Sequence, residues 1–319
     1  MQIGRDDAKL FGRLKFHVPK LSSSSIDTGW RFGLLLSALL CVLPSLLPPA
    51  LATDATGRLT GECRRDFKVA LDIGHTLSQP GATSANGITE FHYNRRLAQA
   101  AHDELTKLGV LVVLSGADGG PLRLGERTRL AKAARADLFL SLHHDSVQPR
   151  YLSSWAVGGQ MRSYSDVFRG YSVFVSGEGG QFPASLRFAS LLGGSLLHAG
   201  LKPSLHHAEQ IPGEGRPLLD ARLGIYRFDQ LVVLRTASMP AALLEAAVIV
   251  NREEEEQAQS PVFLQRLATA IARSVREYCS LTTEPPPRIG VGPTALPVTR
   301  ARHAADRSWP VMPAPRPAP

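Results

Sequence analysis

The middle of the chain alternates between short apolar runs and stretches in which apolar residues recur every three or four positions. A short apolar run bounded by polar residues or glycine predicts a buried strand, and the helical recurrence predicts an amphipathic helix. The predicted strands are Lys68–Ile73, Val110–Leu114, Leu138–Leu142, Ser172–Val175, Leu231–Leu234 and Ala241–Leu244. The predicted helices are Tyr93–Leu108, Gly125–Ala134, Ser185–Leu201 and a last helix that starts at Ser260-Pro261.

The order of these elements predicts the fold class. Strands that alternate with helices are typical of an α/β fold with a mostly parallel or mixed central sheet, flanked by helices on both faces. A single domain over residues 66–281 accounts for all of the predicted elements.

The two ends of the chain have a different character. An apolar stretch, Phe32–Leu47, follows several basic residues and precedes Ala50-Leu51-Ala52, which has the A-x-A form of a cleavage site. We therefore expect residues 1–52 to be a secretory signal peptide, followed by a linker over 53–65. An uncleaved membrane anchor is the alternative, and the prolines at the end of the stretch disfavour it. Residues 282–319 are rich in proline, which predicts a disordered tail.

Composition narrows the compartment and the partners. The net charge is +8, but much of the excess lies in the first 52 residues and in the tail, which leaves the domain itself close to neutral. A domain close to neutral lacks the excess positive charge that is typical of nucleic-acid-binding proteins. A cleaved leader predicts an exported protein in the periplasm or cell-wall space. There, Cys63 and Cys279 would either form a disulfide that joins the two ends of the domain or remain two free thiols.

Candidate chemistry lies where the predicted strands end. His75 follows the first strand, His143 and His144 follow Leu138–Leu142, and Glu245 follows Ala241–Leu244. Glu90 lies at the start of the first helix. Ligands of open α/β sheets bind beyond the carboxyl ends of the strands, so these residues are expected to converge on one edge. Two imidazoles and a carboxylate are a typical ligand set of a catalytic zinc site.

Each of these residues also has a simpler interpretation. A histidine at a strand end is most often a hydrogen-bonded surface residue, and a glutamate at a helix start stabilises the helix dipole. Glu245 is harder to explain in this way, because an unpaired carboxylate within A-A-L-L-E-A-A-V-I-V would be costly to bury. Strand alternation alone does not choose between His143 and His144.

Other polar residues are expected to be structural. His206-His207 lies in a loop rich in glycine and proline; the pair could touch substrate but is interpreted as solvated. His92 and His102 fall on the first helix and are read as structural or exposed. The acidic run Glu253–Glu256 precedes the last helix and is explained by helix-dipole chemistry.

Four ordered segments resemble the zinc-dependent N-acetylmuramoyl-L-alanine amidases of bacterial cell separation, over about residues 66–280. They are V-A-L-D-I-G-H at 69–75, G-I-T-E-F-H-Y-N-R-R-L-A at 87–98, the segment 124–146 that ends in S-L-H-H-D-S, and P-A-A-L-L-E-A-A-V-I-V-N-R-E-E-E at 240–255.

The resemblance implies a role for each candidate. The family's zinc ligands fall on His75, Glu90 and His143, and its catalytic glutamate falls on Glu245. The implied cofactor is Zn²⁺. The implied reaction is hydrolysis of the amide bond between N-acetylmuramic acid and the L-alanine of the stem peptide, in cell-wall remodelling and daughter-cell separation.

The chain also departs from the family pattern. Thr76 stands where the family usually has glycine, which makes the turn less permissive, and His144 replaces a small residue. Some members carry a long insertion whose helix blocks the zinc until a partner protein displaces it. The corresponding segment here, Ser176–Ala184, is short, although the loops Gln148–Gly170 and Ser204–Gln230 could replace such an insertion.

The expected partner is peptidoglycan, with a protein activator as a further possibility, no nucleic acid, and a monomeric chain. Two alternatives to the amidase remain: another zinc-dependent wall peptidase or deacetylase, and an inactive peptidoglycan-binding protein.

Overall fold

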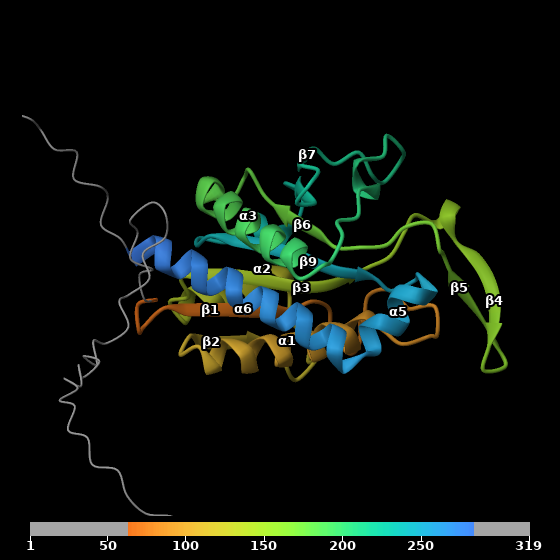
Figure 1. Cartoon of the computed structure of the whole chain (residues 1–319), viewed down its shortest axis with the longest axis horizontal. Coiled ribbons are helices and arrows are strands. Elements are labelled where there is room, and N and C mark those ends of the chain that lie inside the picture. The colour runs from red at the N-terminus through yellow and green to blue at the C-terminus, as the bar shows by residue number, and fades with distance from the viewer. Residues whose placement is uncertain (1–62, 284–319) are drawn as a thin grey trace, which may run out of the picture. The chain divides into compact units, whose positions relative to one another are not determined.

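The computed structural model describes residues 63–283 (Figure 1). The predicted signal peptide, residues 53–62 of the predicted linker and residues 284–319 of the predicted tail lie outside the described residues.

A seven-stranded mixed sheet forms the centre of the described chain, in the order β2-β1-β3-β9-β6-β8-β7. The strands β2, β1, β3 and β9 are parallel neighbours, β6 is antiparallel to β9, and β8 is parallel to β6. The carboxyl ends of β1, β3 and β9 therefore meet at one edge. The strands of this sheet are β1 Lys68–Ile73, β2 Leu111–Ser115, β3 Leu138–Asp145, β6 Ser172–Val175, β7 Leu218–Asp220, β8 Ile225–Arg227 and β9 Ala241–Val248.

Helices cover both faces of the sheet, as the sequence predicts. On one face, α6 packs between α1 and α3 (Figure 1), and on the other face α2 packs against α4. Within residues 63–283, no helix has the length and apolar character needed to cross a membrane. The helices are α1 Glu90–Lys107, α2 Leu124–Ala133, α3 Phe182–His198, α4 Val232–Arg235, α5 Arg252–Gln259 and α6 Pro261–Thr283.

Alternation along β1 divides its side chains between these two layers. Val69, Leu71 and Ile73 pack in the core beneath α1, α3 and α6, whereas Ala70 packs with the α2 and α4 side. Asp72 continues the second series and is fully buried. β3 and β9 alternate in the same way until their register shifts between His143 and Asp145.

Most predicted elements are present, but one predicted strand is helical and two strands are longer than predicted. The predicted strand at Leu231–Leu234 is wrong, because this segment forms the helical turn α4. A four-residue apolar run does not distinguish a buried strand from a buried helical turn, and Val233 and Leu234 are buried against the sheet in either case. β3 and β9 extend beyond their predicted ends, so the candidate residues His143 and Glu245 lie within strands rather than after them.

Several elements had no prediction. A hairpin of β4, Ser153–Val157, and β5, Gln160–Tyr164, forms a separate two-stranded sheet. The acidic run Glu253–Glu256 lies in α5, where it does more than stabilise the helix N-terminus. Glu255 is fully buried and accepts hydrogen bonds from Ser84 and Tyr93, which ties α5 to α1 and to the loop before it.

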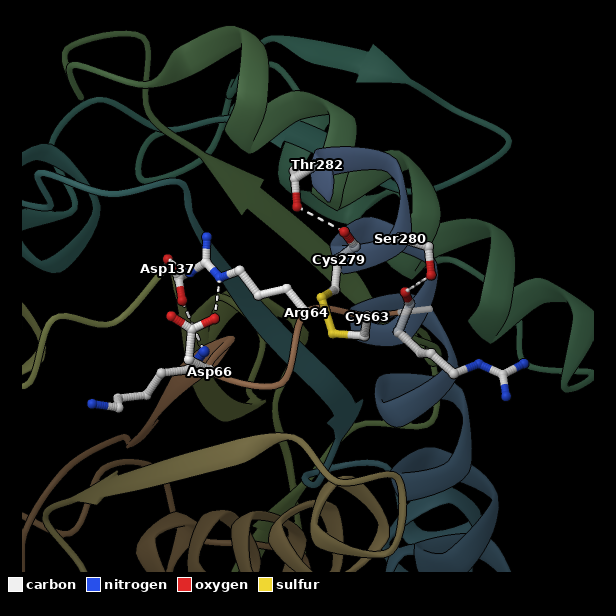
Figure 2. Close-up of a disulfide and its surroundings, with 9 residues drawn as sticks. Cys63, Arg64, Asp66, Asp137, Cys279, Ser280 and Thr282 are labelled. Atoms are coloured by element: carbon white, nitrogen blue, oxygen red, sulfur yellow. Dashed lines mark hydrogen bonds and ion pairs between the residues drawn. A yellow bond between two sulfur atoms is a disulfide. The ribbon is translucent and has the colours of Figure 1, made fainter. Parts of the chain in front are cut away.

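A disulfide joins Cys63 to Cys279, so the structure resolves the alternative that the sequence left open. The Cα atoms are 5.1 Å apart, and the sequence separation of the two cysteines is 216 residues. Figure 2 shows the bond between the segment before β1 and the last part of α6, beside the ion pairs that Arg64 makes with Asp66 and Asp137. The bond therefore closes nearly the whole described chain into one loop.

We expect the double variant Cys63→Ser/Cys279→Ser to lose about 2–5 kcal/mol of unfolding free energy, because the bond restricts the unfolded chain. Chemical denaturation of the full chain measures this. Reductant should destabilise the wild type by a similar amount and should leave the double variant, which keeps Cys41, unchanged. Equal stability of the two proteins without reductant would contradict the prediction.

Candidate metal centre and active site

The three predicted metal ligands lie together at the carboxyl edge of the sheet. His75 follows β1, Glu90 is the first residue of α1, and His143 lies near the end of β3. His75 Nε2 is 2.9 Å from Glu90 Oε2, and His143 Nδ1 is 2.9 Å from Glu90 Oε1. All the candidate ligand atoms of this group lie within 4.8 Å of one another. The group joins residues from three separate parts of the sequence.

Two glycines allow these side chains to come so close. A Cβ atom on Gly74 would lie 2.3 Å from the imidazole ring of His143. A Cβ atom on Gly81 would lie 2.2 Å from Glu90 Oε2, and Gly81 also has a φ of +78°, which favours glycine. The local sequence is thus adapted to bring two imidazoles against one carboxylate.

His143 and His144 have separate roles in the structure. His143 faces Glu90, as the family resemblance implies. His144 is buried against α1, and its Nδ1 donates a hydrogen bond of 2.8 Å to Asn94 Oδ1. Burial lowers the pKa of His144 to about 4, so the ring is neutral. Asn94 also donates to Glu90 Oε1, which links His144 to the ligand group. His144 therefore supports the candidate centre from the side of α1.

In the turn after β1, the residue with a left-handed backbone conformation is His75 and not Thr76. His75 has a φ of +70°, a left-handed conformation that costs free energy in a non-glycine residue. Thr76 is buried, and its hydroxyl accepts a hydrogen bond from the Gln79 backbone, so threonine fits where the family usually has glycine. The backbone carbonyl of His75 accepts a hydrogen bond of 2.7 Å from Arg127.

A buried ion pair lies directly beneath this turn. Arg127 Nη1 donates to Asp72 Oδ1 at 2.8 Å, and both side chains are almost completely buried. Ser115 and Ser141 each donate a further hydrogen bond of 2.7 Å to the Asp72 carboxylate. The network connects β1, β2, β3 and α2 and, through Arg127, fixes the backbone of His75.

Glu90 is held in its charged form. Its carboxylate accepts hydrogen bonds from the Ala82 backbone and from Asn94, besides its contacts with the two histidines. Burial alone would raise the pKa of Glu90, but hydrogen bonds and charges of His143 and His75 outweigh burial and hold the pKa below the usual value. A carboxylate that stays charged is suited to bind a cation.

Glu245 lies next to the ligand group, on the adjacent strand. It pairs with His143 in the register of β3 and β9, and its Oε2 is buried without a hydrogen-bond partner. Burial raises the pKa of Glu245 well above its ordinary value, and the charges of Asp145 and Glu90 add to the effect. Glu245 also lines a cavity of about 280 Å³, together with Asp145, His207, Glu214 and others.

The interpretation of His206-His207 as solvated is wrong. Both side chains are buried, with 2% and 7% of each residue exposed, in the short 3₁₀ turn His206–Ala208. Both side chains lie beside Asp145 at the end of β3. Asp145 was not among the candidate residues predicted from the sequence. The only sequence signal for Asp145 was its place two residues after His143, on the same face of a strand. By contrast, His92 is exposed on α1, as expected.

The donor atoms of His75, Glu90 and His143 fit a metal ion. Two imidazole nitrogens and one carboxylate are a ligand set that zinc accepts in catalytic sites, where a fourth position stays open. The fit rests on the convergence of these atoms and on the two glycines that permit it. Fold and site together define an α/β protein with a candidate metal centre next to a half-buried glutamate, an arrangement typical of metal-dependent hydrolases.

Comparison with known proteins identifies the family. Residues 69–277 match the family of N-acetylmuramoyl-L-alanine amidases, and this chain belongs to that family. The match lies within the predicted catalytic domain and includes His75, Glu90, His143 and Glu245.

Individual relatives are distant in sequence. The chain is 26% identical over 235 residues to the amidase AmiC of Neisseria meningitidis, covering 66% of this chain and 52% of the relative. It is 28% identical over 218 residues to AmiA of Escherichia coli, covering 66% of this chain and 75% of the relative. The chain thus spans about half the length of the first protein and three quarters of the second.

Solved structures show the same fold. The amidase Ami1 of Mycobacterium smegmatis has a TM-score of 0.53 at 21% identity, covering 67% of this chain and 96% of that one. The catalytic domain of the amidase CwlV from Bacillus (Paenibacillus) polymyxa has a TM-score of 0.51 at 25% identity, covering 66% and 97%.

We expect Arg127→Met to lower the unfolding free energy by about 3–5 kcal/mol, because it leaves the Asp72 charge buried without its cation. The His75 carbonyl also loses its donor, so metal binding should weaken. Arg129→Met, which removes an exposed arginine from the same helix, is the matched control and should change stability by about 0.5 kcal/mol or less. Denaturation curves and metal titrations that do not separate the two variants would refute this role of Arg127.

Proposed function

We propose that this chain is an exported, zinc-dependent peptidoglycan amidase that cleaves the bond between N-acetylmuramic acid and the L-alanine of the stem peptide. The observation that carries the proposal is the convergence of His75, Glu90 and His143 beside the half-buried Glu245, in a chain of the amidase family. The curated relatives AmiC and AmiA bear the same activity in their names.

In this proposal, His75, Glu90 and His143 hold the metal ion. Bound zinc supplies Lewis-acid chemistry, because it polarises a carbonyl group and lowers the pKa of water. Glu90 contributes the negative charge of the ligand set, and Asn94 and the Ala82 backbone keep its two oxygens in place. Arg127 fixes the turn that presents the imidazole of His75.

Glu245 is the proposed general base and acid. Its Oε2 has no partner in the protein and borders the cavity, so a proton can be accepted there from the attacking water. The same carboxyl group would then give that proton to the nitrogen of the leaving L-alanine. Burial and the neighbouring carboxylates raise the pKa of Glu245, so its carboxylate is a stronger base than that of an exposed glutamate.

The expected location is the periplasm or cell-wall space. The predicted leader and the disulfide support this assignment, because stable disulfides form in oxidising compartments.

We expect the chain to act as a monomer, and a protein activator remains a further possible partner. Only residues 176–181 separate β6 from α3, so within the described chain no insertion helix lies at that position.

The first prediction concerns the products. Full-length protein incubated with purified peptidoglycan should release intact stem peptides with an L-alanine N-terminus and leave bare glycan, as read by mass spectrometry. A zinc chelator should abolish the release, and added zinc should restore it. Cuts within the stem peptide, loss of acetyl groups only, or binding without cleavage would replace the amidase by a peptidase, a deacetylase or a binding protein.

The second prediction separates the base from the metal ligands. Glu245→Gln should keep zinc but lose about a hundredfold to ten thousandfold in hydrolysis rate, because the amide cannot take up the proton. Glu256→Gln, at an exposed position of α5, is the matched control and should keep full activity. A metal-replete Glu245→Gln protein with wild-type activity would exclude Glu245 as the base.

A further inference from the structure

A second cluster of metal-ligating side chains lies at the cavity that Glu245 lines. Asp145 ends β3, and His206 and His207 come from the 3₁₀ turn in the loop after α3. Asp145 Oδ2 is 2.8 Å from His207 Nε2 and 3.3 Å from His206 Nε2. The three candidate ligand atoms lie within 4.8 Å of one another, the same closeness as in the first group.

The Nδ1 atoms of both histidines are hydrogen-bonded, as is typical of histidines that bind a metal through Nε2. His206 Nδ1 is 2.8 Å from the Ser204 hydroxyl, and His207 Nδ1 is 2.9 Å from Glu214 Oε2. A histidine that binds a metal through one nitrogen almost always donates the other N–H to a carboxylate or another acceptor. Here both rings turn their remaining Nε2 atoms toward the same carboxylate oxygen.

His206 Nε2 is the atom that needs a partner. It is buried and makes no hydrogen bond, although its ring is almost completely enclosed and stacks on Phe168. A buried nitrogen without a partner costs free energy, and Asp145 Oδ2, 3.3 Å away, is already hydrogen-bonded to His207. A cation shared by the three side chains would satisfy this nitrogen.

A simpler arrangement without a metal explains only part of the cluster. Burial lowers the pKa of His207, but the charges and hydrogen bonds of Asp145 and Glu214 outweigh it and raise the pKa to about 9. A protonated His207 between two carboxylates would account for both of its nitrogens. It would leave His206 Nε2 without a partner, and it would place two imidazole rings 3.9 Å apart with one of them charged.

We propose that Asp145, His206 and His207 bind a second divalent metal ion of the zinc class, separate from the ion assigned to His75, Glu90 and His143. Two imidazoles and one carboxylate suit zinc or a neighbouring transition metal better than calcium or magnesium, which prefer oxygen ligands. Asp145 and His207 line the cavity that Glu245 also lines, so the open coordination position faces this cavity. This inference does not depend on which bond the protein cleaves.

Metal analysis of site-specific variants tests the proposal. Full-length protein is saturated with zinc, desalted and measured by mass spectrometry of its metal content. We expect about two zinc ions per wild-type chain and about one after His206→Leu, because a ligand is replaced by an apolar side chain. His75→Asn, in which asparagine tolerates the left-handed backbone, should also retain about one ion, and the double variant about none.

Metal contents of the single variants distinguish failure of the second site from failure of the first. His92→Leu changes an exposed histidine outside both clusters and should keep both ions. One ion in the wild type that survives His206→Leu and is lost in His75→Asn would overturn the second site and leave the first intact. One ion lost only in His206→Leu would instead refute the assignment of the first site.

A variant that keeps all three ligands guards against misfolding. Ser204→Ala removes only the acceptor for His206 Nδ1, and we expect it to weaken zinc binding at this site by about tenfold to a hundredfold. The zinc affinity is measured in the His75→Asn background from the rise in melting temperature that added zinc should cause. The His75→Asn/His206→Leu protein should show no such rise. Unchanged zinc affinity in the Ser204→Ala protein would contradict the proposed coordination.

Discussion

The parallel pairing of β1, β3 and β9 is the constraint on which the candidate site depends. Parallel strands in one sheet bring their carboxyl ends to the same edge, and here that edge carries His75, His143 and Glu245. The register places His143 opposite Glu245 on neighbouring strands, so one of the proposed metal ligands and the proposed base are fixed by the same backbone hydrogen bonds. A one-residue slip of β9 against β3 would separate them and would turn Glu245 to the other face of the sheet.

The buried polar network beneath the edge gives this pairing its specificity. Asp72 is a charged residue in the centre of an apolar sheet, and it is stable there because Arg127, Ser115 and Ser141 satisfy its carboxylate. These partners come from α2, β2 and β3, so the network forms only when the correct elements are adjacent. The guanidinium that neutralises Asp72 also binds the carbonyl of His75, which couples the order of the strands to the geometry of the ligand group.

The sequence predicted the parts of the fold that depend on local pattern. β1 and β6 were predicted at their observed bounds, and the places of His75 and Glu90 followed from the end of one strand and the start of one helix. The choice of His143 over His144 needed the family resemblance, because alternation separates the two faces but does not say which face α1 covers. The segment Leu231–Leu234 was misassigned because its apolar run is too short to show a period.

The second cluster was missed for a different physical reason. The burial of His206 and His207 comes from contacts with Phe168 and Asp145, which are far away in the sequence, while their own loop has the composition of a solvated segment. Loop composition reports local flexibility and polarity, and it carries no information about which distant surface will cover the loop.

The same long-range contacts concentrate negative charge at the sheet edge. Glu90 and Asp145 both raise the pKa of Glu245, so these carboxylates repel one another across the end of β3. Arg216, which forms an ion pair with Glu214, opposes this effect on Glu245, and the histidines of the two clusters contact Glu90 and Asp145. Cations bound at the two proposed sites would relieve this repulsion.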